Sequence, residues 1–485
     1  MTLAAPRTSR PGARPLIETR PLRNPDLGDA AMMGRRGWWL VVLNALIPGS
    51  AQVLAGNRRL GRFGLGATLI GWLLLVFGAG LALVARPALI WLVSGPLSWI
   101  VLTLAQVALI GYAVLWLVLT VDALRLVRLV RLPAVSRWVV PIASLLVMAL
   151  AGGGAVYAST VAASSRGALD AIFGNSGPSL PPSDGYYNIL LLGADSGDGR
   201  DSMRFDSISV VSVNAETGAV TITGIPRELP HAPFSEGSPM LELYPDGFAG
   251  QSSATCGWNG WMNQIRNAAE VCREDHGKSL YPDAAAHGSA PGIEATKDAA
   301  EGVLGLEIPY YVFLDMNGFA QLVDALGGVD IEVTERLPKG GPPEGWHGGP
   351  EDVGEWAIGW IEPGKQHMNG DTAQWYARSR YTTDDWDRMK RQRELQVAIL
   401  EQFTPENVLT RFNEIAAAGT SLVDTDLPKD KLPEFFDLVM KAKKHPVTRI
   451  ELTPDNGVDE HEPDYEQIRA MIEETLHPPT STPAP

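Results

Sequence analysis

Three long stretches without a charged residue dominate the first third of the chain: 63–85, 97–121 and 138–158. A helix needs about 20 apolar residues to cross the hydrocarbon core of a bilayer, so each stretch is long enough. One such stretch could be a buried core helix, but three in succession favour a membrane region, which we place at residues 37–158. The first begins too late in the chain for a cleavable signal peptide. We therefore expect an integral membrane protein.

The charges that flank these stretches predict their orientation. Residues 1–158 contain 15 arginines, no lysine and four acidic residues, a net charge of +11. Fourteen of the 15 arginines lie before the first stretch or between the second and the third. Since positive residues stay on the cytoplasmic side, we expect the arginine-rich tail, 1–36, to be cytoplasmic and everything after Ala158 to be outside.

A further apolar stretch, 38–55, precedes the first predicted span. It is interrupted by polar or turn-forming residues: Asn44, Pro48, Gly49, Ser50 and Gln52. If it crossed the membrane, either the N-terminal arginines or those at 125–137 would lie on the outer side. We therefore expect a re-entrant or interfacial hairpin that packs against the spans.

Beyond residue 158 the pattern changes to short alternating elements. Residues 159–185 are rich in Ser, Gly and Pro, which is typical of a linker. Apolar or β-branched runs predict strands at 188–194, 206–214, 219–225, 310–315, 328–333 and 447–453. Helical periodicity predicts helices at 293–306, 316–326, 369–380 and 386–403. Strands mixed with helices throughout indicate an α/β layered domain.

Two stretches, 229–292 and 337–366, fit no regular element and are rich in Gly, Pro and Trp. Loops this long in a compact domain are usually functional or disordered. The tryptophans in them, Trp258, Trp261, Trp346, Trp356 and Trp360, could stack on sugars, contact lipid headgroups or simply anchor the loops to the core. The last residues, 477–485, are expected to be disordered.

The two cysteines, Cys256 and Cys272, both lie in the part of the chain that we expect outside the membrane. In an oxidising compartment, a pair at this separation favours a disulfide, which would contribute roughly 3 kcal/mol by closing a loop. Two buried thiols are the alternative. No metal-binding spacing accompanies the cysteines, so a zinc site is not expected.

Composition limits the classes of function. Of 485 residues, 45% are hydrophobic and 20% are charged, which excludes a wholly disordered chain. The part after residue 158 has 25 basic and 51 acidic residues, a net charge of −26. Because this part would repel phosphate overall, a generally basic nucleic-acid-binding protein is not expected.

The first candidate site is the segment 193–207, GADSGDGRDSMRFDS, which follows a predicted buried strand. It contains Asp195, Asp198, Asp201 and Asp206, with Arg200 and Arg204 among them. Carboxylates without nearby His or Cys suit a hard cation such as Mg²⁺, and interleaved arginines suit phosphate oxygens. A merely charged, solvated loop is the alternative.

The second candidate site is the segment 377–394, ARSRYTTDDWDRMKRQRE. Arg378 and Arg380 lie two residues apart, and helical spacing places Arg388, Arg391 and Gln392 on one face. These arginines need an anionic partner, which is either a ligand phosphate or the neighbouring aspartates of a surface salt-bridge helix. A third segment, IPRE at 225–228, presents Arg227 just after a predicted strand.

Together these segments resemble the LytR-CpsA-Psr family of membrane-anchored cell-wall ligases. The resemblance covers roughly residues 186–403 and rests on four blocks in order: LLLGADS with RFDSISVVSVN; TGIPRE; YYVFLDMNGFAQLVDALGGVDIEV; and GKQHMNGDTAQWYARSR with DWDRMKRQRE. It implies an exported α/β/α domain in three layers with a mixed sheet, which residues 404–476 would complete. It also implies transfer of a glycopolymer from a polyprenyl pyrophosphate to peptidoglycan, with Mg²⁺ or Mn²⁺ as cofactor.

The resemblance assigns roles to individual residues. It implies that Asp195 and Asp206 are catalytic and hold the metal, and that Arg204, Arg227, Arg378 and Arg380 grip the pyrophosphate. It implies that Asp385, Arg388 and Gln392 complete the site, and Arg391 shares their helix face. The chain departs from the family pattern at Glu228, in place of an aspartate, and at Trp261, where the family carries a lysine.

Three functions are compatible with these residues. The first is a glycopolymer phosphotransferase, and the second is a hydrolase that cleaves the same pyrophosphate with water. The third is a non-catalytic regulator that binds envelope lipids. The carboxylate pair and the five arginines favour the two enzymes, whereas Trp261 in place of a lysine favours the regulator.

Overall fold

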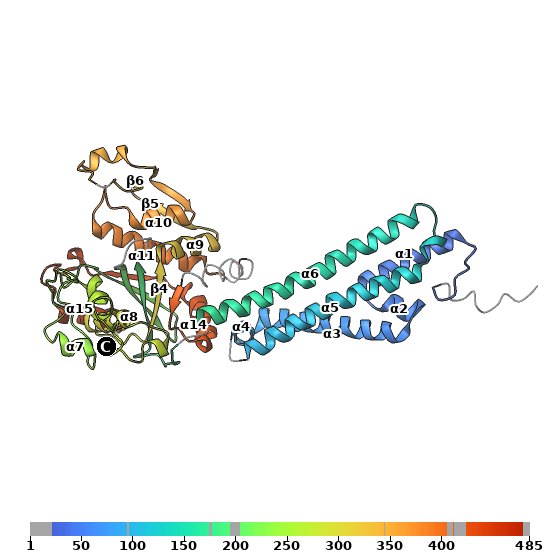
Figure 1. The fold of residues 1–485 in the computed structure, drawn as a ribbon, viewed down its shortest axis with the longest axis horizontal. Helices are drawn as coiled ribbons and strands as arrows, with labels where there is room; N and C mark the ends of the chain where they lie inside the picture. Colours follow the sequence, from blue (N-terminus) through green and yellow to red (C-terminus); the bar gives the residue numbers. More distant parts are fainter. Residues whose placement is uncertain are drawn as a thin grey trace, which may run out of the picture. The chain divides into compact units, whose positions relative to one another are not determined.

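The computed structural model describes residues 22–94, 97–173, 177–194, 204–343, 345–404, 411 and 423–478. The chain divides into two compact units, whose elements are labelled in Figure 1. One unit is helical and comprises residues 1–89 and 99–163; the other mixes strands and helices and comprises residues 90–98 and 164–485.

The helical unit contains three helices that are long and apolar enough to cross a membrane: Arg58–Val84, Ser98–Arg131 and Ser136–Ser164. They coincide with the three predicted stretches. They consist of α3 (Arg58–Val84), of α5 (Ser98–Val127) with the 3-10 turn η2 (Leu129–Arg131), and of most of α6 (Ser136–Phe173); the short α4 (Arg86–Ser94) comes between α3 and α5 in the chain. Large apolar side chains such as Leu73 and Phe77 are exposed, as expected of helices that contact lipid.

The stretch 38–55 forms most of α1 (Ala30–Leu46) and all of α2 (Ser50–Ala55). Between the two helices, Gly49 adopts a φ of 95°. A Cβ atom at Gly49 would lie 2.5 Å from the backbone nitrogen of Leu65, so only glycine fits this turn. The helix is therefore broken where the Pro-Gly pair predicted a turn.

Helix α6 continues beyond the predicted end of the third span. The sequence favoured a linker over 159–185, but the helix runs to Phe173. The segment 159–173 has many alanines and no proline, so nothing in it terminates a helix. The first proline after it is Pro178. The irregular part of the predicted linker is correspondingly shorter.

The second unit is built on a six-stranded mixed sheet in the order β10-β3-β2-β1-β4-β9. Its strands are β1 (Tyr186–Ala194), β2 (Phe205–Asn214), β3 (Val220–Ile225), β4 (Tyr310–Asp315), β9 (Val423–Thr425) and β10 (Thr448–Glu451). Strands β1, β2 and β3 pair antiparallel, as do β4 and β9, whereas β1 with β4 and β3 with β10 are parallel. The predictions for the three antiparallel strands are correct to within two residues.

Helices cover both faces of this sheet. They are α8 (Pro291–Leu304), α11 (Asp385–Gln402), α14 (Leu432–Ala442) and α15 (Tyr465–Leu476), whereas α9 (Met316–Leu326) and α10 (Gly370–Arg378) pack in a second core. Leu190 and Val210 on one face share a core with α8 and α15. Val211 and Val213 on the other face pack against residues of α11 and α14. The expected three-layer α/β/α fold with a mixed sheet is confirmed.

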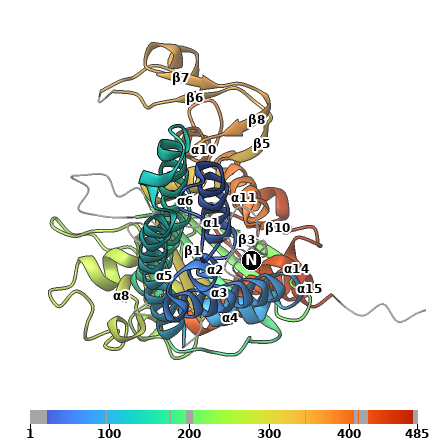
Figure 2. The ribbon, with the colours of Figure 1, turned by 90° about the vertical axis from the view of Figure 1, so that its right-hand side faces the viewer.

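A smaller apolar core holds a second group of elements together: α9, α10, part of α11, and two small two-stranded sheets. The strands of these sheets are labelled in Figure 2. One sheet pairs β5 (Val329–Val333) with β8 (Gly364–Met368), and the other pairs β6 (Leu337–Lys339) with β7 (Gly359–Ile361); η6 (Pro350–Glu355) lies between β6 and β7 in the chain. The stretch 337–366 is therefore not one irregular loop. Strands of three residues are too short for a period-2 pattern to reveal them.

The other predicted loop, 229–292, contains only short helical turns. They are α7 (Pro239–Leu243), η3 (Met262–Gln264), η4 (Asn267–Val271) and η5 (Ala285–His287); η7 (Lys429–Lys431) and η8 (Pro454–Asn456) are similar turns near the C-terminus. A disulfide joins Cys256 to Cys272, whose Cα atoms lie 5.8 Å apart. Within the closed loop, Trp258 is buried and its ring stacks on that of Phe248. This tryptophan anchors the loop to the core.

We predict that replacing both cysteines, Cys256→Ser with Cys272→Ser, lowers the free energy of unfolding by about 3 kcal/mol, because the open loop gains conformational entropy when the chain unfolds. Urea unfolding of the wild-type and double-mutant chains, followed by far-UV circular dichroism, measures the difference. Labelling of the wild-type chain by a thiol reagent without prior reduction would contradict the disulfide.

Candidate active site

Two of the predicted site residues are placed by the register of the sheet. Asp206 is the second residue of β2, and Arg227 follows the end of β3 by two residues. Ile208 of β2 pairs with Ile225 of β3, so Asp206 and Arg227 lie at the same end of the sheet. The end of β1 is there too, because its Gly193 pairs with Ser207.

The N-terminus of α11 brings two more predicted residues to this place. Asp384 caps the helix by accepting a hydrogen bond from the backbone N–H of Asp387 at 2.8 Å. The cap fixes the first turn, which carries Asp385 and Arg388. The Nη2 atom of Arg388 contacts Asp385 Oδ2 at 2.9 Å.

Arg227 connects these groups into one ion-pair cluster. Its Nη1 donates to Asp206 Oδ1 at 2.7 Å, its Nη2 lies 3.0 Å from Glu228 Oε1, and its Nε lies 3.6 Å from Asp385 Oδ2. Asp385 Oδ2 therefore faces both Arg227 and Arg388. The arginine side chains are only 15% and 6% exposed, respectively. We call Asp206, Arg227, Glu228, Asp385 and Arg388 the arginine–carboxylate cluster.

The electrostatics around Arg388 favour an added anion. Burial lowers the pKa of Arg388, and the neighbouring Arg227 lowers it further. Burial also opposes the charge of Arg227, but the carboxylates of Asp385, Asp206 and Glu228 outweigh it and raise its pKa. An anion beside Arg388 would relieve the cost of burying its charge.

The cluster also has unused hydrogen-bonding capacity. Among the residues that the structure describes, the buried atoms Arg227 Nε, Asp385 Oδ1 and Arg388 Nε have no hydrogen-bond partner. Buried polar atoms are nearly always paired in folded proteins, so each such atom needs an explanation. Three of them in one cluster indicate a site built for a bound ligand.

Two other predicted residues of α11 are buried against the protein itself. Arg391 donates from Nε to the carbonyl oxygen of Tyr376 at 3.0 Å, and from Nη2 to the carbonyl of Ser379 and the hydroxyl of Thr383. It holds the segment after α10 against α11, which is a positioning role. Gln392 donates weakly to the carbonyl of Ala377 at 3.4 Å. Direct contact of either residue with substrate stays a prediction.

The remaining predicted arginines lie at the borders of the site. Arg204 is exposed and comes just before β2. Arg378 ends α10, with its guanidinium 5.3 Å from the centre of the Trp375 ring. Arg380 is exposed, and its charge contributes to lowering the pKa of Arg388. Asp195, the other predicted metal ligand and catalytic residue, lies outside the described residues.

Two pockets each include residues of the arginine–carboxylate cluster. The first is an apolar cavity of about 180 Å³ lined by Leu191, Leu192, Gly193, Asp206, Ser207, Leu314, Asp315, Met316, Phe319, Leu322, Ala377, Gln392, Leu395, Gln396 and Ile399. The second is a pocket of about 350 Å³ lined by Pro226, Arg227, Glu228, Leu229, Pro230, Trp261, Asp385, Trp386, Glu460 and His461. The bond between Asp206 and Arg227 links the two pockets, which have no lining residue in common.

A hard cation fits the cluster by its chemistry. Asp206 offers a carboxylate beside the arginines, and the other predicted ligand, Asp195, lies outside the described residues. Mg²⁺ is usually held by one or two carboxylates together with substrate phosphates, so two such groups are enough.

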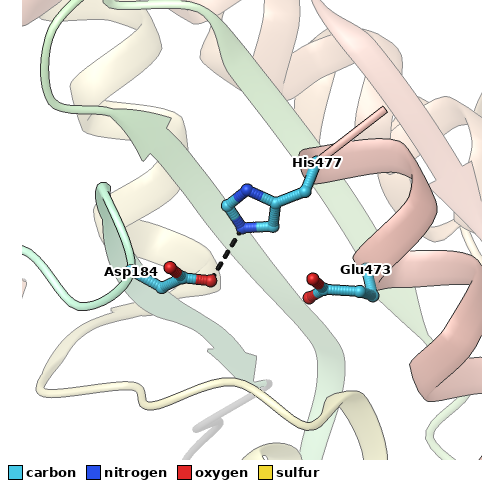
Figure 3. Close-up of side chains that lie close together, drawn as sticks. All are labelled: Asp184, Glu473 and His477. Carbon is cyan, nitrogen blue, oxygen red and sulfur yellow. Dashed lines mark ion pairs between the residues drawn. The ribbon is translucent and has the colours of Figure 1, made fainter. Parts of the chain in front are cut away.

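A different group, Asp184, Glu473 and His477, has three possible metal ligands within 4.8 Å of one another. All three are exposed, and His477 Nε2 already pairs with Asp184 Oδ2 at 2.9 Å (Figure 3). This group adjoins the start of β1, roughly 30 Å along the strand from the cluster. It ties the end of α15 to the sheet and takes no part in the site.

The structure adds residues that the sequence did not suggest. Trp386 and His461 line the second pocket: Trp386 lies in the candidate segment 377–394 but was assigned no role there, and His461 lies in none of the candidate segments. Arg393 is completely buried behind the cluster, with Nη2 3.4 Å from the hydroxyl of Ser207 and Nε 3.9 Å from Glu451. In the sequence Arg393 is only one more charge in a charged helix, so nothing marked it as buried.

Comparison with known proteins supports one family. Residues 263–475 match the LytR_cpsA_psr family. The chain is 26% identical to biofilm regulatory protein A of Streptococcus mutans over 56% of this chain and 58% of that protein. It is 25% identical to the polyisoprenyl-teichoic acid–peptidoglycan teichoic acid transferase TagU of Bacillus cereus over 63% of this chain and 82% of that protein. The match thus spans less than two thirds of the streptococcal relative.

Among solved structures, TagV of Bacillus subtilis covers 61% of this chain and 98% of its own, at 19% identity and a TM-score of 0.40. The family match spans α8, α9, α10, α11 and most of α15, and it includes Asp385 and Arg388 of the arginine–carboxylate cluster. Residues 263–475 of the chain are thus similar to the LytR-CpsA-Psr family.

Proposed function

We propose that this protein is a phosphotransferase that moves a glycopolymer from a polyprenyl pyrophosphate carrier onto peptidoglycan. The observation that carries the proposal is the junction at Asp206, where an apolar cavity meets the arginine–carboxylate cluster. A polyprenyl pyrophosphate has the matching parts in the same order, since an apolar chain ends in two adjacent phosphates.

The cavity fits the lipid and the cluster fits the pyrophosphate. Apolar side chains from β1, α9 and α11, such as Leu191, Leu322 and Ile399, line the cavity. Arg227 and Arg388 supply positive charge and unpaired N–H groups at its polar end. The predicted arginines Arg204, Arg378 and Arg380 would add to this charge around the phosphates.

The transfer step needs no covalent protein intermediate. An acceptor hydroxyl oxygen forms a new bond to the phosphorus next to the glycan, while the bond from this phosphorus to the oxygen of the lipid phosphate breaks. In this proposal Asp385 takes the hydroxyl proton, a role supported by its Oδ1 atom, which has no hydrogen-bond partner among the described residues. Polyprenyl phosphate leaves, and the arginines neutralise the charge that grows on it.

The names of the relatives support this reaction class. TagU is named for transfer of polyisoprenyl-linked teichoic acid to peptidoglycan, and a related solved structure is of TagT bound to LIIa-WTA. For the present chain, the donor is a polyprenyl-pyrophosphate-linked glycopolymer and the acceptor is peptidoglycan.

Mg²⁺ or Mn²⁺ is part of the proposal. Asp206, with the predicted Asp195, would hold the cation beside the pyrophosphate. When bound, it would neutralise phosphate charge that otherwise repels the attacking hydroxyl.

Membrane topology is part of the proposal. In it the three apolar helices cross the membrane, the arginines at 125–137 and the N-terminus are cytoplasmic, and the α/β unit is extracytoplasmic; the apolar lengths and the flanking arginines support this arrangement. The lipid carrier keeps its pyrophosphate at the same membrane surface.

We predict that Arg378→Ala and Arg380→Ala each lower glycan transfer at least about a hundredfold, because each removes charge from the pyrophosphate site. The assay uses the full-length chain in detergent, a polyprenyl-pyrophosphate-linked glycan and peptidoglycan fragments. Arg336→Ala is the control, since Arg336 is exposed, pairs with Glu362 and lines neither pocket.

Retained transfer in either variant would refute the assignment of that arginine, and loss of the folded circular dichroism signal would indicate a structural salt bridge instead. The same assay separates the three functions. Release of the glycan phosphate without transfer indicates a hydrolase. Donor binding with neither release nor transfer, at any Mg²⁺ concentration, indicates a non-catalytic regulator.

We predict that Leu322→Trp weakens binding of a long polyprenyl pyrophosphate about tenfold, because the larger ring fills the apolar cavity. Binding of geranyl pyrophosphate, whose chain is short, should change much less. Leu243→Trp, at a 49% exposed position on α7, is the matched control. Titration of both lipids into the three chains measures the effect, and equal loss for the long and the short lipid would contradict a role of the cavity in holding the chain.

We predict that chelation of divalent cations with EDTA reduces transfer at least about a hundredfold and that added Mg²⁺ or Mn²⁺ restores it. Asp206→Asn should raise the Mn²⁺ concentration needed for half-maximal activity, and it should weaken the Mn²⁺ binding that electron paramagnetic resonance detects in the presence of the donor. Full activity in EDTA would exclude the cation from the reaction.

A further inference from the structure

The second pocket is lined by two tryptophans whose rings make no ring–ring or cation–ring contact with the described residues. Trp261 and Trp386 line it, and both are half-buried. Among the residues that the structure describes, neither takes part in a ring–ring or cation–ring contact. The five other tryptophans beyond residue 164 do: Trp258, Trp346, Trp356, Trp360 and Trp375.

We infer that Trp261 and Trp386 form the subsite for a sugar ring of the acceptor glycan. This inference rests on the proposed transfer function and names the part of the site that takes the second substrate. A pocket of about 350 Å³ lies within the range of small-ligand sites. Aromatic rings offer a flat apolar surface to the C–H face of a sugar, and nearby carboxylates accept hydrogen bonds from its hydroxyls.

The position of the pocket selects the acceptor rather than the lipid. The apolar cavity reaches the cluster at Asp206, whereas the second pocket reaches it at Arg227 and Asp385. In phosphoryl transfer the attacking and leaving oxygens lie roughly in line on opposite sides of the phosphorus. With the lipid phosphate leaving towards the cavity, the attacking hydroxyl arrives from the side of the tryptophans, next to Asp385 Oδ1.

The rim of the pocket also suits a polymer. The side chains of His461 and Glu460 are 83% and 45% exposed, and that of Glu228 is 49% exposed. The pocket therefore opens to solvent beside the reacting groups, so a glycan strand can extend beyond the ring that is held.

The charges of the pocket favour a sugar over a phosphate. Glu228, Asp385 and Glu460 line it, and Arg227 is already surrounded by carboxylates. A lysine at position 261, as in the family pattern, would add a positive charge for an anion. Trp261 supplies a ring instead. A tryptophan in place of a lysine would therefore favour stacking of a sugar over binding of a phosphate on this wall.

The wall that carries Trp261 is held in place before any ligand arrives. Its neighbours bond to the segment after β3: the N–H of Met262 donates to the carbonyl of Leu229 at 3.1 Å, and that of Asn263 to the carbonyl of Arg227 at 2.8 Å. Because the tryptophan and Arg227 are fixed to one another, a ring bound at Trp261 has a defined distance from the cluster.

The test compares Trp261→Ala and Trp386→Ala with the wild-type full-length chain in detergent, using a soluble GlcNAc–MurNAc oligomer as acceptor. Each variant should raise the acceptor KM about tenfold, while donor binding and the acceptor-independent release of glycan phosphate stay within twofold. Trp261→Phe should retain most of the affinity. Trp360→Ala is the control, because Trp360 packs on Arg336 and lines neither pocket.

The outcomes separate this inference from the proposed function. Unchanged acceptor KM in both alanine variants, or loss of donor binding in either, would overturn the subsite. If the wild type showed no transfer and no release, the proposed function would fail by itself. Binding of the oligomer, measured by saturation-transfer NMR, would then decide the subsite: signals that disappear in Trp261→Ala support it, and signals that persist in both alanine variants, or none with the wild type, overturn it.

Discussion

The site depends on keeping two positive charges together where little water screens them. Arg227 and Arg388 approach the same oxygen, Asp385 Oδ2, and both side chains are mostly buried. Like charges repel strongly in such surroundings, so the shared carboxylate is what makes the pair possible. Because Arg227 comes from the end of β3 and Arg388 from the first turn of α11, the sheet and the helix must meet in one arrangement for the pair to form.

Regular elements with a clear period were predictable from the sequence, and elements defined by distant pairing were not. The apolar run of β1 and the alternation of β2 and β3 identify buried strands locally. In contrast, β6 and β7 have three residues each and exist only because residues 337–339 pair with 359–361. Helix α6 outlasts its apolar stretch because helix propensity, unlike hydrophobicity, does not stop at the membrane boundary.

Four of the predicted site residues, Asp206, Arg227, Asp385 and Arg388, lie together in the cluster, whereas their roles stay predictions. Helical spacing placed Arg388 and Arg391 on one face, but only the structure shows that Arg391 donates to carbonyl groups at the end of α10 and just after it. The sequence indicated no role for Trp386, because a single tryptophan between two aspartates matches no ligand-binding motif. The net charge of −26 likewise averages over a surface and says nothing of one buried cluster of arginines.

The disulfide has a consequence for the timing of activity. It closes the loop that carries Trp261, since that residue lies between Cys256 and Cys272 in the chain. A reduced loop has more conformations open to it, so one wall of the second pocket is less well defined before the cysteines are oxidised. The reducing cytoplasm keeps thiols apart. In the proposed topology, an exported chain would therefore complete the wall that carries Trp261 only when its two cysteines are oxidised.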